Sequence, residues 1–407
     1  MTPEVRDRIE QIRHGNVPEG YNKTKVGIFP CEWNVQPLNK LLEFKNGINA
    51  DKAKFGRGTK LISVRDILSD YAITYETIQG SVDVNEQQIE EFGVKYGDIL
   101  FQRSSENYED AGTSNVYLDS NNIAVFSGFV IRGKKISEYN PVYLNALLRT
   151  SYVRKAIIRQ AAGAQHINIG QESLAKVHIA LAAYSEQKKI AEILTAQDKV
   201  IELQEKRLAE KQRQKKYLMQ QLLTGKKRLN GFSEPWTTVE LEEVFDYLQP
   251  TPYLVESTNY SDSYSTPVLT AGKTFVLGFT NETTGIYNDL PVVIFDDFTT
   301  DSKYVDFPFK AKSSAMKILK IKSGYNILFA YEAMQAIRFV VGGHERHWIS
   351  KYSKLTIDMP SVEEQNAISD VISTMNKELF LLEQELEQEK QKKKALMQLL
   401  LTGIVRV

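Results

Sequence analysis

One stretch of this sequence occurs twice. Residues Glu186 to Gly225 align without a gap with Glu364 to Gly403 at an offset of 178 residues, and the two copies end in KKYLMQQLLTG and KKALMQLLLTG. A weaker repeat, at an offset of 203 residues, matches FPCEWNVQPLNKLLEF with FSEPWTTVELEEVFDY. The chain is therefore a tandem duplication, and we expect two similar globular parts that alternate with two similar helices.

The stronger repeat has the period of a coiled coil. In both copies the seam residues recur at alternating steps of four and three. They are Ile190, Leu194, Gln197, Ile201, Gln204, Leu208, Lys211, Lys215, Leu218 and Leu222 in the first copy, and Ile368, Ile372, Met375, Leu379, Leu382, Leu386, Glu389, Lys393, Leu396 and Leu400 in the second. This pattern predicts two long helices whose apolar stripes need a partner. We favour the other copy in the same chain, running antiparallel, over a second subunit in a homodimer.

The segment before the first helix indicates mixed strand and helix. Residues 58–67 and 96–105 are typical of strand-turn units, and residues 123–133 are typical of a further strand. Residues 140–163 predict a helix that Asn140 caps, Pro141 begins and Gly163 ends. This segment is therefore expected to form a domain of mixed secondary structure.

The segment between the two helices has several short β-rich runs. They are 265–280, 290–298, 314–321 and 325–334. Both segments also carry a related phrase, GDILF at 97 and GYNILF at 324, which favours a common ancestral fold.

Together these patterns predict an α+β fold. Two globular mixed α/β domains are joined by two long helices that pair as an antiparallel coiled coil, in a pseudo-twofold tandem repeat. The expected parts are an N-terminal helical segment (1–23), the first globular domain (24–185), the central spacer helix (186–229), the second globular domain (230–363) and the C-terminal spacer helix (364–407).

Composition limits where such a chain works. The 407 residues, 42% of them hydrophobic, suffice for two cores, and the single cysteine, Cys31, excludes an intramolecular disulfide framework. No apolar run approaches the roughly 20 residues that span a bilayer. The N-terminal MTPEVRDRIEQIRHG is a charged helical pattern rather than a signal peptide. We therefore expect a cytoplasmic protein.

Three short motifs resemble parts of enzyme active sites. TAGKT (270–274) ends like a phosphate-binding loop, but the earlier glycine that such a loop needs is replaced by Pro267. NPVY (140–143) lacks the second proline of the amino-methyltransferase motif and suits a helix cap. FDDFTTDSK (295–303) offers carboxylates for a magnesium-dependent nuclease, although their close spacing favours a turn. None of these makes a complete active site, so we expect a non-catalytic chain.

The charge balance of the chain predicts that any contact with nucleic acid is made by a few local groups and not by a wholly basic surface. The chain carries 51 basic and 51 acidic residues, whereas a protein that holds duplex DNA alone is usually more basic. Donors that suit base edges and phosphates are nevertheless grouped in loops. The DNA-binding candidates are Lys52, Lys54, Arg57, Lys60, Arg103, Ser104, Gln165, His166 and Asn168 in the first domain, and Lys273, Thr274, Thr299, Thr300, Lys303, Lys312, Ser313 and Arg346 in the second.

The sequence resembles the specificity (S) subunits of type I restriction-modification enzymes. The resemblance rests on TKVGIFPCEW, YSEQKKIAEIL, KKYLMQQLLTGKKRLNGFSEPW, SKLTIDMPSVEEQNAI and KKKALMQLLLTG, and it covers nearly the whole chain. Two features depart from the family pattern. The first helix opening, IALAAYSEQ, lacks the proline of IDMPSVEEQ, and the N-terminal segment has no second copy.

This resemblance implies a division of labour. Each globular domain would be a target-recognition domain for one half of a split DNA site, and the helices would set the gap between the halves. The helices would also dock two methyltransferase subunits, with restriction subunits added in the full complex. S-adenosylmethionine, ATP and magnesium would be bound by those partners and no cofactor by this chain. Two other functions stay open, a stand-alone repeat DNA-binding regulator and a magnesium-dependent nuclease.

Overall fold

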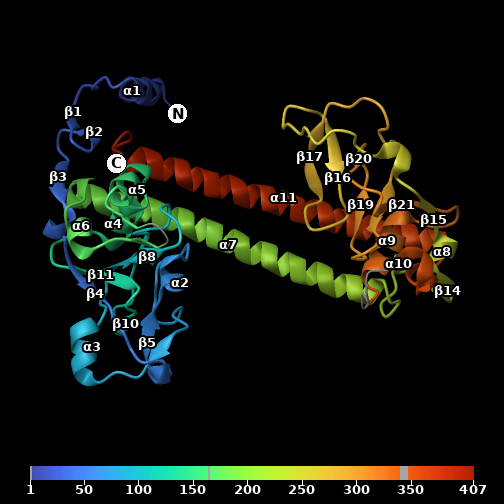
Figure 1. Ribbon diagram of the computed structural model, residues 1–407, viewed down its shortest axis with the longest axis horizontal. Helices are drawn as coiled ribbons and strands as arrows, with labels where there is room; N and C mark the ends of the chain where they lie inside the picture. The colour runs from blue at the N-terminus through green and yellow to red at the C-terminus, as the bar shows by residue number, and fades with distance from the viewer. Residues whose placement is uncertain (1, 164–165, 340–346) are drawn as a thin grey trace. The chain divides into compact units, whose positions relative to one another are not determined.

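The computed structural model describes residues 2–163, 166–339 and 347–407, which form two compact units (Figure 1). Unit 1 comprises Met1–Gln204 and Glu385–Val407, and unit 2 comprises Glu205–Gln384. Each unit therefore combines one globular domain with a part of each long helix. Among the described residues, no helix is long and apolar enough to cross a membrane.

Unit 1 alternates short strands and helices. Its strands are β1 (Tyr21–Thr24), β2 (Gly27–Pro30), β3 (Asn34–Pro37), β4 (Leu42–Asn46), β5 (Phe55–Ile62), β6 (Ser81–Val82), β7 (Ile99–Gln102), β8 (Ser104–Ser105), β9 (Ser114–Val116), β10 (Val125–Phe126), β11 (Val130–Lys135), β12 (Ile167–Asn168) and β13 (His178–Leu181). Its helices are α1 (Pro3–Arg13), α2 (Val64–Ile67), α3 (Glu86–Phe92), α4 (Pro141–Leu148), α5 (Ser151–Ile158), α6 (Gln171–Ala175) and the first half of α7 (Tyr184–Leu222), with short 3-10 turns at η1 (Leu38–Lys40) and η2 (Lys52–Lys54).

Unit 2 has fewer elements in a similar order. Its strands are β14 (Thr237–Glu240), β15 (Phe245–Leu248), β16 (Thr266–Leu269), β17 (Val276–Thr280), β18 (Val292–Asp296), β19 (Ser302–Val305), β20 (Lys310–Ala311), β21 (Met316–Ile321) and β22 (Thr356–Met359). Its helices are α8 (Leu241–Val244), α9 (Ile327–Gln335), α10 (His347–Ser350) and the first half of α11 (Val362–Leu400), with 3-10 turns at η3 (Thr251–Tyr253) and η4 (Tyr352–Lys354).

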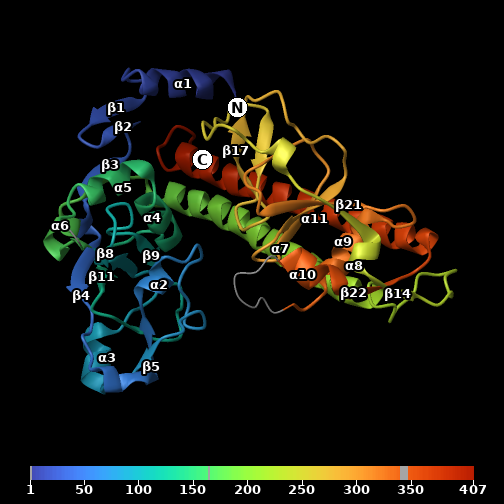
Figure 2. The ribbon, with the colours of Figure 1, turned by 45° about the vertical axis from the view of Figure 1, so that its right-hand side comes forward.

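The two units contain the same pair of sheets. A four-stranded antiparallel sheet has the order β4-β11-β7-β9 in unit 1 and β15-β21-β18-β19 in unit 2. A three-stranded sheet has the order β10-β5-β6 in one and β20-β16-β17 in the other, and its first pair is parallel in both. This match confirms the predicted duplication of a mixed α/β domain. In Figures 1 and 2, β5 and α3 lie at the end of the unit 1 domain farthest from α7.

The predicted helix over 140–163 is two helices in the structure. Asn140 caps α4, because its side chain accepts a hydrogen bond from the backbone of Tyr143, and Pro141 begins the helix as expected. The chain then breaks at Arg149, and α5 begins after Thr150 and ends at Ile158. The prediction that Gly163 ends the helix was therefore wrong.

The phrases GDILF and GYNILF are not equivalent. The first lies on β7, whereas Ile327 to Gln335 form α9, so the prediction of a strand over 325–334 was wrong. Asn326 starts this helix by accepting from the backbone of Leu328 and Phe329. Its backbone N–H in turn donates to Gln365 on α11 at 2.7 Å. The partner that fixes the helix start is thus distant in sequence.

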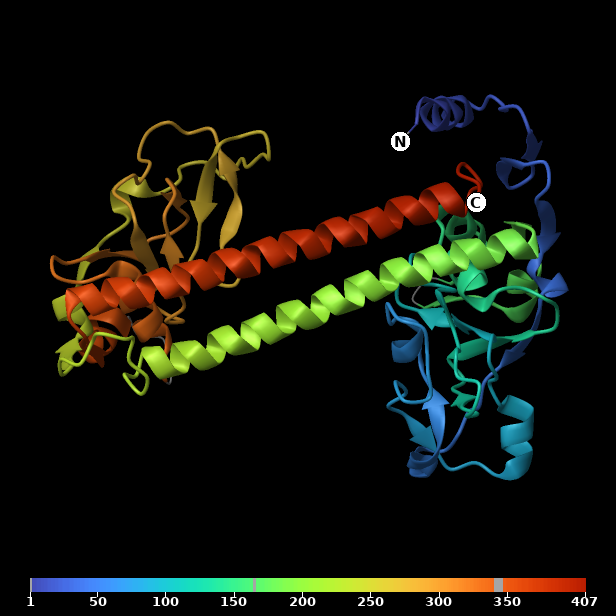
Figure 3. The ribbon, with the colours of Figure 1, turned by 180° about the vertical axis from the view of Figure 1, so that it is seen from behind.

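The seams of the two long helices are covered within the chain. None of the seam residues of either copy is exposed. In unit 1, Gln197 donates to the Glu389 carboxylate at 2.6 Å, and Lys393 pairs with Asp198. In unit 2, Lys211 pairs with Glu378 at 2.8 Å. In unit 1, Ile190 shares a core with Leu400 while Gln197 meets Glu389, so later positions on α7 lie beside earlier positions on α11. In unit 2, Lys211 meets Glu378 and Leu222 shares a core with Ile368, so the two helices run antiparallel in each unit (Figure 3).

Each globular domain packs both long helices into its core. The largest core of unit 1 includes Ile190 and Leu194 of α7 together with Leu400 of α11. The corresponding core of unit 2 includes Leu222 of α7 together with Ile368 of α11. The helices are therefore anchored by buried apolar contacts in both units, which is the main source of their stability.

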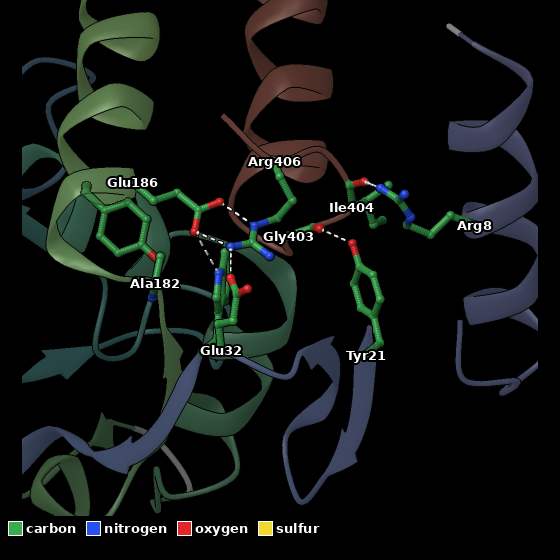
Figure 4. A network of polar contacts seen from close by, with 10 residues as sticks. Arg8, Tyr21, Glu32, Ala182, Glu186, Gly403, Ile404 and Arg406 are labelled. Atoms are coloured by element: carbon green, nitrogen blue, oxygen red, sulfur yellow. Dashed lines mark hydrogen bonds and ion pairs between the residues drawn. The ribbon is translucent and has the colours of Figure 1, made fainter. Parts of the chain in front are cut away.

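The two ends of the chain meet in unit 1. Arg406 donates to the Glu186 carboxylate at the start of α7 and to Glu32 (Figure 4). Tyr21 donates to the backbone oxygen of Gly403, and Arg8 of α1 donates to that of Ile404. The segment after α11 is thus held against the N-terminal strands and α1.

Candidate nucleic-acid interface

Four of the unit 1 candidates come together beside the end of β7. Arg103 follows that strand directly, and Ser104 lies on β8. β8 pairs with β12 in a register that places Asn168 opposite Ser104. His166 precedes β12, and its backbone oxygen accepts a hydrogen bond from the Asn168 side chain at 3.0 Å. Two loops that are far apart in sequence therefore form one polar surface.

A cavity of about 360 Å³ opens at this surface. Its wall is largely polar, with Ser104, Asn107 and His166, and one aromatic residue, Phe129. Gln102 belongs to the same wall, is 5% exposed and donates to the backbone oxygen of Ser104 at 2.9 Å. Its Oε1 atom has no hydrogen-bond partner among the described residues. A buried acceptor without a partner costs free energy, so this cavity suits a ligand that carries a donor.

The loop that shapes this cavity is held from behind. The guanidinium of Arg154 on α5 donates to the backbone oxygens of Glu109 and Ala111, both at 2.8 Å. Burial lowers the pKa of Arg154. The guanidinium stays protonated at any physiological pH because the ordinary pKa of arginine is far above that range. The segment between β7 and β9 is therefore fixed to the domain core through a half-buried cation.

The basic loop of residues 45–60 is only partly available. Lys54 is exposed, and Lys52 lies in the turn η2. Arg57 pairs with Asp83 at 3.1 Å, and the Lys60 ammonium donates to the backbone oxygen of Ile78 at 2.6 Å. Two of the four candidate cations therefore have partners inside the domain. The candidates Gln165 and Arg346 lie outside the described residues.

Unit 2 brings its candidates together on two neighbouring connections. Thr299 and Thr300 lie on the turn between β18 and β19, and Lys303 lies on β19. Lys312 and Ser313 lie on the connection between β20 and β21. The two connections adjoin, because the backbone N–H of Asp297 donates to Ala315 at 3.1 Å. Lys273 and Thr274 are exposed on the separate turn between β16 and β17.

The carboxylates of Asp296 and Asp297 serve the fold of unit 2. Asp296 accepts from the backbone of Phe298 and Thr299, which makes the predicted turn. Asp297 is fully buried, accepts from the backbone of Trp348 and lies 3.9 Å from the Lys317 ammonium. Among the described residues, no group of three or more His, Cys, Asp or Glu side chains is placed to hold a metal ion. These positions give no support to a nuclease centre.

The same connection carries different residues in the two units. The turn between β10 and β11 in unit 1 corresponds by topology to the connection between β20 and β21, which carries Lys312 and Ser313. In unit 1 this turn is Ser127, Gly128 and Phe129. Phe129 was not among the sequence candidates, because the run 123–133 was predicted as one strand and is in fact β10, a turn and β11. The Ser-Gly before Phe129 is the sequence signal that marks this turn. The units thus share a frame and differ in the side chains that it presents.

Comparisons with known proteins agree with this duplicated architecture. The family model described as "Type I restriction modification DNA specificity domain" matches twice, at residues 30–212 and 233–391. A type I restriction enzyme specificity subunit from Escherichia coli is 49% identical over 140 residues, which are 33% of this chain and 34% of that protein. A protein from Methanocaldococcus jannaschii assigned as such a subunit is 26% identical over 436 aligned positions, or 96% and 97% of the two chains.

A solved structure has the same fold. The S subunit of the type I restriction-modification system from M. genitalium matches with a TM-score of 0.59 at 13% identity. The match covers 90% of this chain and 96% of that one.

Proposed function

Because this chain belongs to the type I restriction-modification DNA specificity family, we propose that it is the DNA specificity subunit of such a complex. It recognises a bipartite DNA target, with one half-site for each globular domain and a gap that the helices set. It docks methyltransferase subunits, which methylate adenine, and restriction subunits join in the full complex. The target-recognition domains are residues 24–185 and 230–363, and the spacers are 186–229 and 364–407.

One observation carries this proposal more than any other. Both units contain the same pair of sheets in the same order, yet the connections at the strand ends carry unlike donors. Unit 1 presents Arg103, Ser104 and His166, and unit 2 presents Thr299 and Lys312. A shared frame with unlike contact residues is what two different half-sites require, because hydrogen bonds to base edges carry sequence information.

The chemistry is assigned to partner subunits. The matched relatives are named specificity subunits, and the carboxylates around Asp297 are engaged in folding unit 2. S-adenosylmethionine, ATP and magnesium are therefore expected on the partners. The balance of 51 basic and 51 acidic residues fits a chain that selects bases while partners supply much of the phosphate contact.

The test is to identify the target through methylation. The chain is co-expressed with candidate methyltransferase subunits, and genomic DNA is sequenced by a single-molecule method that detects modified adenine. We expect modification at a split motif that depends on this chain. A contiguous motif, or a pattern that is unchanged when the chain is omitted, would refute the proposal.

Two variants assign the half-sites. Ser313→Ala is expected to change only one half of the motif, and Ser104→Ala only the other. The purified chain alone, with magnesium, separates the remaining possibilities. Tight sequence-specific binding without partners would favour a stand-alone regulator, and cleavage of DNA would favour a nuclease.

A further inference from the structure

Phe129 is an aromatic side chain that the fold presents to solvent. It is 67% exposed, which is the largest exposed fraction among the large hydrophobic side chains of the described residues. A single exposed apolar residue needs no explanation by itself. The position of Phe129 is notable because this residue lines two separate cavities of unit 1.

The backbone below this ring is fixed. The N–H of Arg103 donates to the backbone oxygen of Phe129 at 2.9 Å, and the N–H of Val130 donates to Ser127 at 2.9 Å. Ile48 forms a parallel bridge with Ser127, which ties the turn to the segment after β4. The main chain that carries Phe129 is therefore fixed, while the ring itself is 67% exposed and free to turn about its side-chain bonds.

Two glycines make this arrangement possible. A Cβ atom on Gly128 would lie 1.8 Å from the Asn49 Oδ1 atom, and a Cβ atom on Gly47 would lie 2.2 Å from the backbone oxygen of Ser127. A side chain at Gly47 would meet backbone and push the turn away, whereas one at Gly128 would displace the Asn49 side chain. The sequence thus keeps two backbones in close approach at the turn that carries the most exposed phenylalanine of the described residues.

The two cavities beside the ring differ in character. On one side, a hollow of about 690 Å³ is lined by apolar side chains that include Ile48, Leu61 and the half-exposed Phe55. On the other side lies the polar cavity of about 360 Å³ with the unpartnered Oε1 of Gln102. A nucleobase has the same two faces, an apolar π-surface that stacks on aromatic rings and an edge that hydrogen-bonds.

Positive charge lies next to the ring. The Arg103 guanidinium is 3.3 Å from the backbone oxygen of Gly128, to which it donates. The backbone N–H of Arg103 also donates to the backbone oxygen of Phe129, so the cation and the ring are carried by the same hydrogen-bonded turn. A cation at this place can contact a phosphate of the strand whose base the ring meets, which fixes the register of the contact.

We propose that Phe129 packs its ring against a base of the half-site recognised by unit 1, at a base step that opens to admit it, while Gln102 accepts a hydrogen bond from the edge of the adjoining base. This inference rests on the proposed function. It goes further, because it makes DNA deformation part of the recognition of one half-site. Unit 2 has Ala315 at the corresponding place, so this particular contact has no aromatic equivalent there.

The experiment uses the assembled complex with methyltransferase subunits and duplexes that carry the target found by methylation. Phe129→Ala is expected to weaken specific binding about tenfold, the loss typical of one base stacked on an aromatic ring. Phe129→Trp should retain at least half of the affinity, and Phe129→Leu should lose it as alanine does. Binding to unrelated duplexes and association with the methyltransferase subunits should not change.

A fluorescent base reports the opening itself. 2-Aminopurine is placed in turn at each position of the unit 1 half-site, and its fluorescence should rise at one step with wild-type protein and not with Phe129→Ala. The matched control is Ile136→Ala, which is 52% exposed just beyond the other end of β11 and should behave as wild type.

The outcomes separate two failures. If the wild-type complex binds no specific duplex, the proposed function is wrong. If it does, and Phe129→Ala binds equally well with the same fluorescence, the inference is wrong. A loss that extends equally to unrelated duplexes would also overturn it, because stacking on one base step would then not be the cause.

Discussion

Arg406 and Glu186 form a two-pronged ion pair, with Nε 2.6 Å from Oε1 and Nη2 3.1 Å from Oε2. Trp33 donates to the same carboxylate at 3.0 Å. Unit 2 contains the equivalent group, in which Arg228 and Trp236 donate to Glu364 at 2.6 Å and 3.2 Å. Each arginine lies three residues after the Thr-Gly that ends a long helix. In unit 2 the chain leads directly from Arg228 into the globular domain. In unit 1, Arg406 lies in the segment after α11 and reaches the globular domain only through non-covalent contacts.

Removing the guanidinium of Arg406 should destabilise unit 1. Glu186 is 5% exposed, so Arg406→Ala leaves a buried carboxylate with Trp33 as its remaining side-chain donor. We expect a loss of about 2 kcal/mol, towards the low end for a broken buried pair because the Arg406 side chain is itself 36% exposed. Urea unfolding measures this, and removal of residues 403–407 should cost at least as much.

The control for that variant is Arg213→Ala. Arg213 lies 3.8 Å from Glu210 on the surface of α7, and both side chains are more than half exposed. Its removal should change the free energy of unfolding by less than about 0.5 kcal/mol. If both arginine variants unfold at the same urea concentration, the docking of the C-terminus contributes nothing measurable.

Glu332 should make unit 2 less stable as pH rises. Burial raises the pKa of Glu332 above its ordinary value of 4.5, and the nearby Lys215 offsets this only in part. Above pH 4.5 the unfolded chain has lost a proton that the folded chain still holds, so stability falls until pH passes the folded-state pKa. The glutamine of Glu332→Gln does not ionise, so folding of the variant buries no charged group there. The variant should therefore melt at a higher temperature than wild type at pH 7.

Thermal melts at pH 4, 5.5 and 7 test this dependence. The difference between Glu332→Gln and wild type should vanish near pH 4. Glu383→Gln, at an exposed position on α11, is the matched control and should follow wild type at every pH. A variant that loses stability at pH 7 would mean that the Lys215 attraction outweighs the burial of the carboxylate.

Lengthening both spacer helices should widen the DNA gap. Seven residues inserted before Leu208 in α7 and seven at the facing position near Leu382 in α11 add about 10.5 Å. This corresponds to about three base pairs at 3.4 Å each. We expect the same two half-sequences with a longer gap, as determined by sequencing methylated adenine. Insertion after Gly231, which is exposed outside the helices, should leave the gap unchanged, and an unchanged gap in the helix variant would exclude the ruler role.

Lys312 should affect one half-site only. Its ammonium donates to the Tyr260 hydroxyl at 3.1 Å and lies over the ring, so the cation is positioned on the β20–β21 connection. Lys312→Ala should reduce methylation about fivefold at sub-saturating DNA and relax the unit 2 half-site, the effect of losing one charged contact to a base edge. Lys377→Ala, at an exposed position on α11, should leave both half-sites intact. Equal relaxation of both halves would show that Lys312 acts through stability.

The long helices could be predicted because their signal is periodic and local. Heptads over ten seam positions define one face, and every such position in both copies is shielded in the structure. The run at 325–334 was misjudged because a short apolar stretch suits a strand or a buried helix equally well. The helix forms there because Asn326 caps it and is held by hydrogen bonds with Gln365 and Ser369 on α11, which the local sequence does not reveal.

The candidate interface was predicted less completely. Polar residues near strand ends could be selected by type, and Ser104, His166 and Asn168 do meet. Composition could not show that Arg57 and Lys60 have partners inside the domain, since Asp83 and Ile78 approach them only through tertiary folding. Phe129 was missed because apolar residues are assigned to the core by default, and exposure depends on the turn that carries the side chain.

The hydrogen bond between Gln197 and Glu389 disfavours the exchange of long helices between two copies of this chain. By the internal repeat, Gln197 corresponds to Met375, and Glu389 corresponds to Lys211. If two chains exchanged partners so that α7 paired with α7, Gln197 would face Lys211, and α11 paired with α11 would leave the Glu389 carboxylate against Met375. Only the unlike pair satisfies the carboxylate. The internal repeat thus differs at seam positions 197/375 and 211/389, and this difference favours pairing of α7 with α11 over pairing of identical helices from two chains.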